Sequence, residues 1–263
     1  MAYENIVLDV SADGTAVLTL NRPQKRNAFN AEVIEELTDA FETLSKNPEC
    51  RLVLIRGNGP VFSAGADLEW MKAAADYTQS ENEEDAFAMA EMLRRCFELP
   101  QATIALVHGA AMAGACGLVA AADIAIARAG TTFAFSEVKL GIIPATISPY
   151  IVNAIGPRWA RTLFVTAEKF DAEMAQRIGL VNHVVADEQA METLVEHYAN
   201  LVYDASPAAV ADAKALVDDV TGEVIDASLG HMTAKRLAHR RVSQQGKEGL
   251  AAFLEKRKPD WAR

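Results

Sequence analysis

Residues 104–123, IALVHGAAMAGACGLVAAAD, decide how the chain folds around its site. They begin with an apolar run, turn at His108-Gly109, and continue from Ala113 as small and apolar residues. This order predicts a buried strand that leads into the first turn of a helix, where backbone N–H groups lack intrahelical partners and the helix dipole adds positive charge. Because no bulky side chain lies between Ala113 and Gly117, a ligand oxygen can approach the amide of Gly114 closely. We expect an oxyanion site here, with tight helix packing as the alternative.

The composition is that of a globular protein with an acidic surface. The chain has 263 residues, of which 51% are hydrophobic and 23% are charged, enough for one large domain or a domain with an appendage. Its 25 basic and 36 acidic residues give a formal net charge of −11. This charge argues against nucleic acid or an anionic membrane as the main partner, although a local basic cluster can still bind phosphate.

The cysteines and the apolar runs indicate the compartment. Cys50, Cys96 and Cys116 are an odd number without paired spacing, so we expect reduced thiols in a reducing compartment. The first ten residues, MAYENIVLDV, lack the basic and long apolar regions of a secretory signal. No run of the sequence reaches the roughly 18 apolar residues of a membrane span. A cytoplasmic protein without a membrane segment is therefore expected.

The first half of the chain alternates between predicted strands and helices, which indicates an α/β fold. Strands are expected at residues 6–10 and 16–20, joined by a hairpin at Asp13-Gly14. A helix is expected to follow an N-cap at Asn30. Further strands are expected at residues 52–55, 103–107 and 123–127.

Two regions depart from this alternation. Residues 72–85 are polar and charged, which predicts a mobile surface segment. Helical periodicity at residues 206–217, 230–242 and 249–258 predicts a helical appendage at the C-terminal end.

A second loop of small residues, SAGAD at residues 63–67, follows the strand expected at residues 52–55. Two backbone donors that converge on one oxygen would stabilise an enolate or a tetrahedral oxyanion by about 3–4 kcal/mol per donor. For either loop alone, a tight turn is the favoured interpretation. Together with Glu137 and the basic residues described next, the two loops favour an oxyanion hole.

Glu137 is a carboxylate among apolar residues, with Phe133 and Phe135 before it and Leu140 after it. Desolvation would raise its pKa and suit it to acid or base chemistry. The alternative is a structural glutamate that pairs with a neighbouring cation such as Lys139.

Basic residues gather at Lys25 and Arg26 and again at residues 256–258. On an acidic background such clusters suit a polyphosphate ligand, with a solvated surface as the alternative. The histidines are scattered, and no histidine or cysteine cluster has the spacing of metal ligands. We expect neither a metal nor a redox cofactor.

Five motifs occur in a characteristic order: NRP and NAF at residues 21–23 and 27–29, FSAGADL at 62–68, His108-Gly109 with Gly114 and Asp123, EVKLGIIP at 137–144, and FLEKR at 253–257. In this order they resemble the enoyl-CoA hydratase/isomerase (crotonase) family over essentially the whole chain. The resemblance implies a spiral of ββα units over residues 1–200. It implies a C-terminal helical region over residues 201–263 that builds homotrimers, often paired into hexamers. It also implies an acyl-CoA thioester as substrate, with coenzyme A as part of the substrate and no separate cofactor.

The resemblance also assigns roles to residues. The amides of Ala66 and Gly114 match the oxyanion hole, and Glu137 matches one of two glutamates that hold the catalytic water in typical hydratases. The residues matching the family's coenzyme A contacts are Lys25, Arg26, Ala28, Ala64, Leu68, Phe253 and Lys256, the last two usually reaching the coenzyme A of a neighbouring subunit.

One position departs from the family pattern. The second glutamate belongs one helical turn after the oxyanion glycine, where this chain has Gly117. Glu137 would then do both proton transfers of a hydration, or the reaction is an isomerisation that moves a β,γ double bond into conjugation. A protein that binds acyl-CoA without turnover is a further alternative.

The acyl pocket is expected to include Gly117, Pro144 and Ile147. Glycine at 117 would leave room for a bulkier acyl group, and ATISP at residues 145–149 replaces a stretch that is usually rich in glycine. Residues 136–156 resemble bacterial hydratases of branched glutaconyl-CoA substrates, such as 3-methylglutaconyl-CoA or isohexenylglutaconyl-CoA. Hydration of a branched α,β-unsaturated acyl-CoA is therefore the expected activity.

Overall fold

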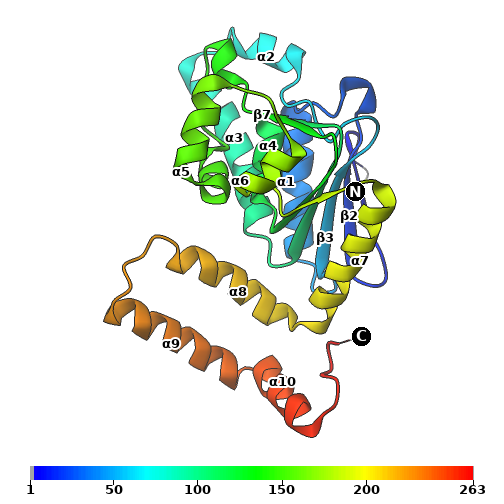
Figure 1. The fold of residues 1–263 in the computed structure, drawn as a ribbon, viewed down its shortest axis with the longest axis vertical. Helices are drawn as coiled ribbons and strands as arrows, with labels where there is room; N and C mark the ends of the chain where they lie inside the picture. Colours follow the sequence, from blue (N-terminus) through cyan, green and yellow to red (C-terminus); the bar gives the residue numbers. More distant parts are fainter. Residues whose placement is uncertain (1–2, 263) are drawn as a thin grey trace.

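A six-stranded sheet lies at the centre of the structure (Figure 1), a computed structural model that describes residues 3–262. The strand order is β1-β2-β3-β4-β6-β9; β1 pairs with β2 antiparallel and all the other neighbours are parallel. The strands are β1 (Ile6–Val10), β2 (Thr15–Leu20), β3 (Leu52–Gly57), β4 (Ala102–Val107), β6 (Ile124–Arg128) and β9 (His183–Val185).

A second, three-stranded sheet continues the chain beyond the first. It contains β5 (Ala110–Met112), β7 (Thr132–Ala134) and β8 (Phe170–Asp171). Strand β4 leads into β5 through Gly109, which has φ +66°, and a Cβ atom there would lie 2.2 Å from the backbone oxygen of Pro60. Only glycine fits this corner. Repetition of strand, short strand and helix confirms the predicted α/β spiral.

Helices cover both faces of the large sheet. Helices α1 (Ala31–Ser45) and α3 (Gln79–Phe97) pack on one face, where Val53 and Ile55 belong to the main core. Helix α7 (Glu188–Asp204) packs on the other face with Leu52 and Leu54. Alternate residues of β3 thus face opposite layers, as a strand buried on both faces requires.

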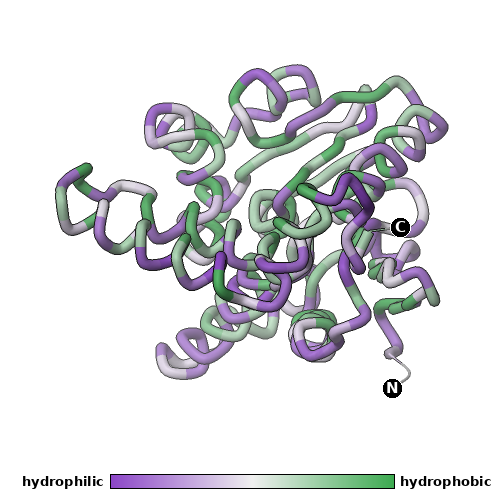
Figure 2. The backbone as a smooth tube through the Cα atoms, turned by 90° about the horizontal axis from the view of Figure 1, so that it is seen from below, coloured by the Kyte–Doolittle hydropathy of each residue, from purple (hydrophilic) through white to green (hydrophobic). Residues whose placement is uncertain are grey.

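Three helices form a layer apart from the sheets, at the lower end of Figure 1: α8 (Pro207–Val220), α9 (Ala227–Val242) and α10 (Gln244–Glu255). No described residue of α8 or α9 is fully buried. Figure 2 views this end and shows hydrophobic and hydrophilic residues alternating along the projecting helices. The predicted helical appendage is confirmed. The boundary expected after residue 200 falls inside α7, and the layer begins with α8.

The segment predicted to be a mobile surface segment, residues 72–85, is largely helical. It contains the end of α2 (Leu68–Ala74) and the first turns of α3. Thr78 and Glu81 form a reciprocal capping box, in which each side chain bonds the other's backbone N–H. The polar sequence reflects an exposed helical surface. The hairpin at residues 6–20 and the cap at Asn30, whose side chain accepts from the amide of Val33 at 3.1 Å, are confirmed.

Arg51, before β3, fastens the C-terminal layer to the core. Its guanidinium donates to the backbone oxygens of Val202 at 2.9 Å, Ala205 at 2.5 Å and Trp261 at 2.8 Å. These carbonyl groups lie at the end of α7, at the start of the link to α8, and near the end of the chain. One side chain therefore holds three separate segments.

Substitution Arg51→Met should loosen this layer, because it removes charge-assisted hydrogen bonds worth at least about 1.5 kcal/mol together. We expect faster proteolytic cleavage within residues 205–262 than in the wild-type protein. Arg94→Met, which removes an exposed arginine from α3, should leave the cleavage rate unchanged. Equal cleavage rates for Arg51→Met and the wild type would contradict this role.

Candidate active site

The loop after β3 is held by a parallel bridge between Phe29 and Ala66. The amide of Phe29 donates to the oxygen of Gly65 at 2.7 Å, and the amide of Asp67 donates to the oxygen of Phe29 at 2.7 Å. Phe29 thus bonds to the residues on either side of Ala66, and in such a parallel bridge the amide of Ala66 itself points away from Phe29. Within residues 3–262 the half-buried Ala66 amide donates to no protein acceptor.

Gly114 begins α4 (Gly114–Ala121), the helix expected from the sequence. The preceding residue, Ala113, donates to the oxygen of Ala134 at 2.8 Å and has φ +50°, an uncommon conformation for a residue with a side chain. No side chain within residues 3–262 caps the helix. In the described chain the Gly114 amide, like that of Ala66, lacks a protein acceptor. A strained residue directly before it is the kind of feature that clusters at functional sites.

These two loops lie side by side. A Cβ atom on Gly65 would lie 2.8 Å from the oxygen of Met112 and 3.4 Å from the Cβ of Ala113. A Cβ atom on Gly114 would lie 3.6 Å from Cδ2 of Phe29, the residue that bridges Ala66. The structure therefore brings together the two segments that carry the predicted oxyanion donors.

Glu137 begins the short helix η2 (Glu137–Leu140) after β7. Its residue surface is 9% exposed, and its Oε2 atom has no hydrogen-bond partner among the residues that the structure describes. Burial raises the pKa of the Glu137 carboxyl group, and the residue's own amide opposes the shift. A buried carboxylate oxygen without a partner is costly and requires an explanation, and carboxyl groups with a shifted pKa cluster at functional sites.

The surroundings of Glu137 relate it to α4. The Cys116 thiol, in the first turn of α4, has a pKa raised by burial and further by the charge of Glu137. Lys139, the alternative partner, donates instead to the backbone oxygen of Ala167 at 2.8 Å. The carboxyl group thus lies within electrostatic range of the helix turn that begins at Gly114.

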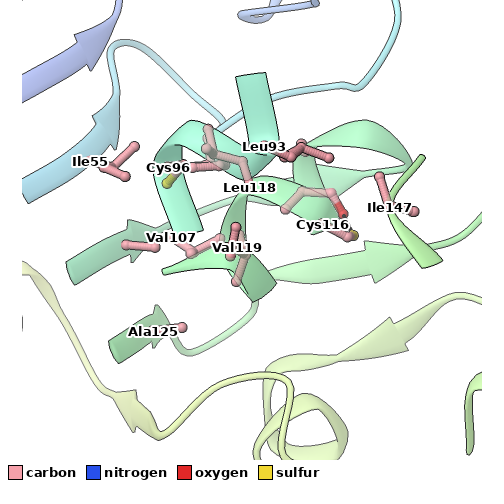
Figure 3. Packing of buried hydrophobic residues seen from close by; sticks show 14 of the residues in the cluster. Ile55, Leu93, Cys96, Val107, Cys116, Leu118, Val119, Ala125 and Ile147 are labelled. Atoms are coloured by element: carbon pink, nitrogen blue, oxygen red, sulfur yellow. Dashed lines mark hydrogen bonds between the residues drawn. The ribbon is translucent and has the colours of Figure 1, made fainter. Parts of the chain in front are cut away.

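The space expected at Gly117 is filled by Ile147. A Cβ atom on Gly117 would lie 2.4 Å from Cγ2 of Ile147 and 3.2 Å from Cδ1 of Leu93. Ile147 is 1% exposed and directly precedes α5 (Ser148–Thr166). Figure 3 shows Leu93, Cys116 and Ile147 within one apolar cluster. The expectation that glycine leaves room for a bulkier acyl group is therefore wrong at this position. Pro144, the third residue expected in the acyl pocket, is also buried.

Five of the residues predicted to bind coenzyme A lie around the Ala66 loop. The amide of Ala64 donates to the oxygen of Arg26 at 2.9 Å, and Lys25 pairs with Glu69 of α2 at 3.2 Å. Leu68 begins α2 and is 81% exposed. Ala28, which is buried, precedes the bridging residue Phe29.

The remaining two predicted residues, Phe253 and Lys256, lie elsewhere. Phe253 is 80% exposed near the end of α10, and Lys256 follows as the cap of that helix. Figure 1 places α10 at the opposite end of the molecule from α2. One chain therefore does not bring these residues to the Ala66 loop.

Sequence patterns missed an ion pair beside Ala66. Arg22 and Asp67 lie 3.1 Å apart and are nearly buried. Both stand inside the five ordered motifs, but 45 positions separate them and no spacing rule connects them. The one signal in the sequence that could have indicated this ion pair is that both residues belong to the ordered motifs.

The other expectations concern metals, membranes and thiols. Within residues 3–262 no group of three or more histidine, cysteine or acidic side chains is arranged to hold a metal ion. None of the helices in this part of the chain has the length and apolar character needed to cross a membrane. The three cysteines are free and buried, as expected for reduced thiols.

Known proteins are similar to this chain over almost its whole length. Residues 11–263 match the family model described as enoyl-CoA hydratase/isomerase. The chain is 34% identical to crotonyl-CoA hydratase of Syntrophomonas wolfei over 263 residues, which cover 99% of each protein.

Solved structures are similar as well. An enoyl-CoA hydratase from Shewanella pealeana has a TM-score of 0.95 and 38% identity, with 98% of this chain and 96% of that chain covered. Pseudomonas aeruginosa AtuE has a TM-score of 0.93 and 35% identity, with 99% of this chain and 100% of that chain covered.

The contact between Gly117 and Ile147 predicts non-additive stability. Gly117→Ala should cost about 1–3 kcal/mol by overpacking, and Ile147→Gly should cost several kcal/mol by opening a cavity. The double variant should cost less than the sum, because each change relieves the other. Urea unfolding measures the three free energies.

Gly230→Ala is the matched control, since no atom lies within 4 Å of a Cβ built at this exposed helical glycine. It should be neutral or stabilising by up to about 1 kcal/mol. Additive costs at positions 117 and 147 would contradict the proposed contact.

Proposed function

Since the chain belongs to the enoyl-CoA hydratase/isomerase family, we propose that it adds water to the α,β double bond of an acyl-CoA thioester. The observation that carries this proposal is the buried carboxyl group of Glu137, whose Oε2 has no hydrogen-bond partner within residues 3–262. It lies within electrostatic range of α4, and in the same part of the chain the amide of Gly114, the first of that helix, is free to donate to a ligand oxygen. The names of the relatives also support hydration.

In the proposed reaction the amides of Ala66 and Gly114 bind the thioester oxygen. They draw electron density from Cβ and stabilise the enolate that forms when water attacks. Glu137, as the carboxylate, takes a proton from that water, and the protonated Glu137 then gives this proton to Cα of the enolate. The reaction needs an acyl-CoA and water, with coenzyme A as part of the substrate.

A raised pKa suits Glu137 to this role. A carboxylate whose pKa lies above the ordinary value is a stronger base once it is ionised. Because the base form is required, turnover should rise with pH through the pKa of Glu137. That rise should lie at a higher pH than an exposed glutamate would give.

Glu137→Gln should lower kcat by about 10²–10⁴-fold, because it removes the acid/base group and keeps the shape. Acyl-CoA affinity should change little. The raised pKa means that the native state binds more protons than the unfolded chain, so ionisation of Glu137 destabilises the fold as pH rises. Above the ordinary glutamate pKa the glutamine variant should therefore be at least as stable as the wild type.

Steady-state kinetics, ligand titration and urea unfolding at neutral pH check these three outcomes. Near-normal turnover of the Glu137→Gln variant would remove the catalytic assignment. A large loss of stability in Glu137→Gln would contradict the claim that the ionised, buried carboxylate of Glu137 destabilises the fold.

The coenzyme A part of the substrate is proposed to lie along Lys25, Arg26, Ala28, Ala64 and Leu68. Phe253 and Lys256 would reach it from a neighbouring copy in a homotrimer or a dimer of trimers. Supporting this, both residues are exposed and lie far from the Ala66 loop of their own chain (Figure 1).

Lys256→Ala should weaken coenzyme A binding, and high salt should reduce the difference from the wild type because it screens the lost charge. Titration with coenzyme A at two salt concentrations measures both effects. Lys46→Ala on α1 removes a lysine that pairs with Glu42 and should have no effect. Unchanged affinity in Lys256→Ala would show that this residue does not reach the ligand.

The acyl group is proposed to be branched and of the glutaconyl type. Support comes from the resemblance of residues 136–156 to bacterial hydratases of branched glutaconyl-CoA substrates. A comparison of kcat/KM for crotonyl-CoA and 3-methylglutaconyl-CoA tests this choice, and a preference for crotonyl-CoA would contradict it. A cytoplasmic location is proposed on the strength of the three free, buried cysteines.

Isomerisation of a 3-enoyl-CoA is the second candidate, favoured by Gly117 and by Ile147, which fills the space of a second carboxylate. Hydration removes the conjugated double bond and isomerisation creates it. The absorbance of the conjugated thioester, followed with 2-enoyl and 3-enoyl substrates on one preparation, separates the two reactions. An unchanged absorbance with both substrates would instead indicate a protein that binds acyl-CoA without turnover.

A further inference from the structure

We propose that Arg22 and Asp67 are positioning residues that hold the amide of Ala66 in place for the developing enolate. This inference rests on the proposed oxyanion role of Ala66. Neither side chain is assigned to the substrate, so both would act through the backbone that they fix.

The Arg22 guanidinium spans both segments of the bridge between Phe29 and Ala66. Its Nη1 donates to the backbone oxygen of Ala28 at 2.8 Å, and its Nη2 lies 3.1 Å from Oδ2 of Asp67. Ala28 directly precedes Phe29, and Asp67 directly follows Ala66. The guanidinium thus clamps the two bridged segments from one side.

Asp67 connects the same clamp to α2. Its Oδ1 accepts from the amide of Glu69 at 2.9 Å and caps the N-terminus of that helix. Although burial alone would raise its pKa, the Glu69 amide and Arg22 hold the pKa of the Asp67 carboxyl group below its usual value. Asp67 is therefore a charged group with both oxygens engaged, on the residue next to Ala66.

Arg22 is itself fixed by Asn27, a buried residue with φ +53°. The Arg22 amide donates to Oδ1 of Asn27 at 2.9 Å, and Nδ2 of Asn27 donates to the backbone oxygens of Asn58 and Val61 at 2.8 and 3.0 Å. The clamp is thereby tied to the loop that runs from β3 toward Ala66.

Low exposure supports a positional role. The side chains of Arg22 and Asp67 are 13% and 5% exposed, and each is held by protein groups on more than one segment. Removing one member leaves the other as a poorly paired buried charge, which moves the segment it holds. A misplaced amide forms a weaker hydrogen bond to the ligand oxygen. This weakening destabilises the enolate most, because its oxygen carries the most charge, and it has little effect on ground-state binding.

Acetoacetyl-CoA is the probe, because the enolate of a β-ketothioester has its own near-ultraviolet absorption. In the wild type the bound ligand should show this enolate band. In Asp67→Asn and Arg22→Lys the bound enolate-to-ketone ratio should fall about tenfold or more, as for loss of an oxyanion donor. Affinity for coenzyme A should stay unchanged within error. Kinetics should show a fall in kcat with little change in KM.

Asp123→Asn is the matched control, because it breaks another partly buried ion pair, Asp123 with Lys214 at 2.8 Å. This variant should lose stability and keep the wild-type enolate ratio. Should Asp67→Asn fail to fold, Arg22→Lys retains the charge and still removes the forked geometry.

An unchanged enolate ratio in Arg22→Lys and Asp67→Asn, with the wild-type band present, would overturn the positioning role alone. A ratio that falls equally in Asp123→Asn would also overturn it, since the loss would follow stability in general. Absence of the band in the wild type would reject the oxyanion hole, and with it the proposed function.

Discussion

In the loop after β3, Ala66 pairs in parallel with Phe29. This short pairing directs the amide of Ala66 away from Phe29. The proposed chemistry depends on this constraint, because an amide that had found a protein acceptor could not receive a ligand oxygen. The Gly114 amide is left without an acceptor for a different reason, namely its place in the first turn of α4. Gly65 allows the two loops to approach within van der Waals distance.

The same region carries costs that the rest of the fold offsets. Ala113 has a positive φ, Glu137 is buried with an unpartnered oxygen, and Arg22 and Asp67 form a buried ion pair. Strained backbone and buried charge cost stability, and the two hydrophobic clusters on the faces of the large sheet supply compensating burial. The concentration of these costly features around two adjacent loops distinguishes this region from the rest of the molecule.

Local chemistry makes much of the fold predictable. Asp13-Gly14, Asn30 and the small residues from Ala113 each determine a turn or a helix start through their own backbone preferences. Polarity alone does not reveal the helix within residues 72–85, although Thr78 and Glu81 form a recognisable capping box at its start. The short strands of the second sheet carry too few residues for a periodic pattern.

The site is predictable to the extent that its residues lie in ordered motifs. Small residues indicate the amide of Gly114, and apolar neighbours indicate Glu137. The family motifs add Ala66 and assign all three residues to one site. The sequence does not reveal that Ile147 fills the space at Gly117, because 30 positions separate these residues and their contact depends on how α5 packs on α4. The link between Arg22 and Asp67 is hidden for the same reason, since tertiary contacts leave no spacing rule in one sequence.

The most direct test of the central claim is the infrared carbonyl stretch of an isotopically labelled, unreactive acyl-CoA such as butyryl-CoA, measured free and bound. Two backbone amides that bind the thioester oxygen would weaken the carbonyl bond, so the band should move to lower frequency on binding. A bound ligand whose carbonyl band stays at the frequency of the free thioester would contradict the account.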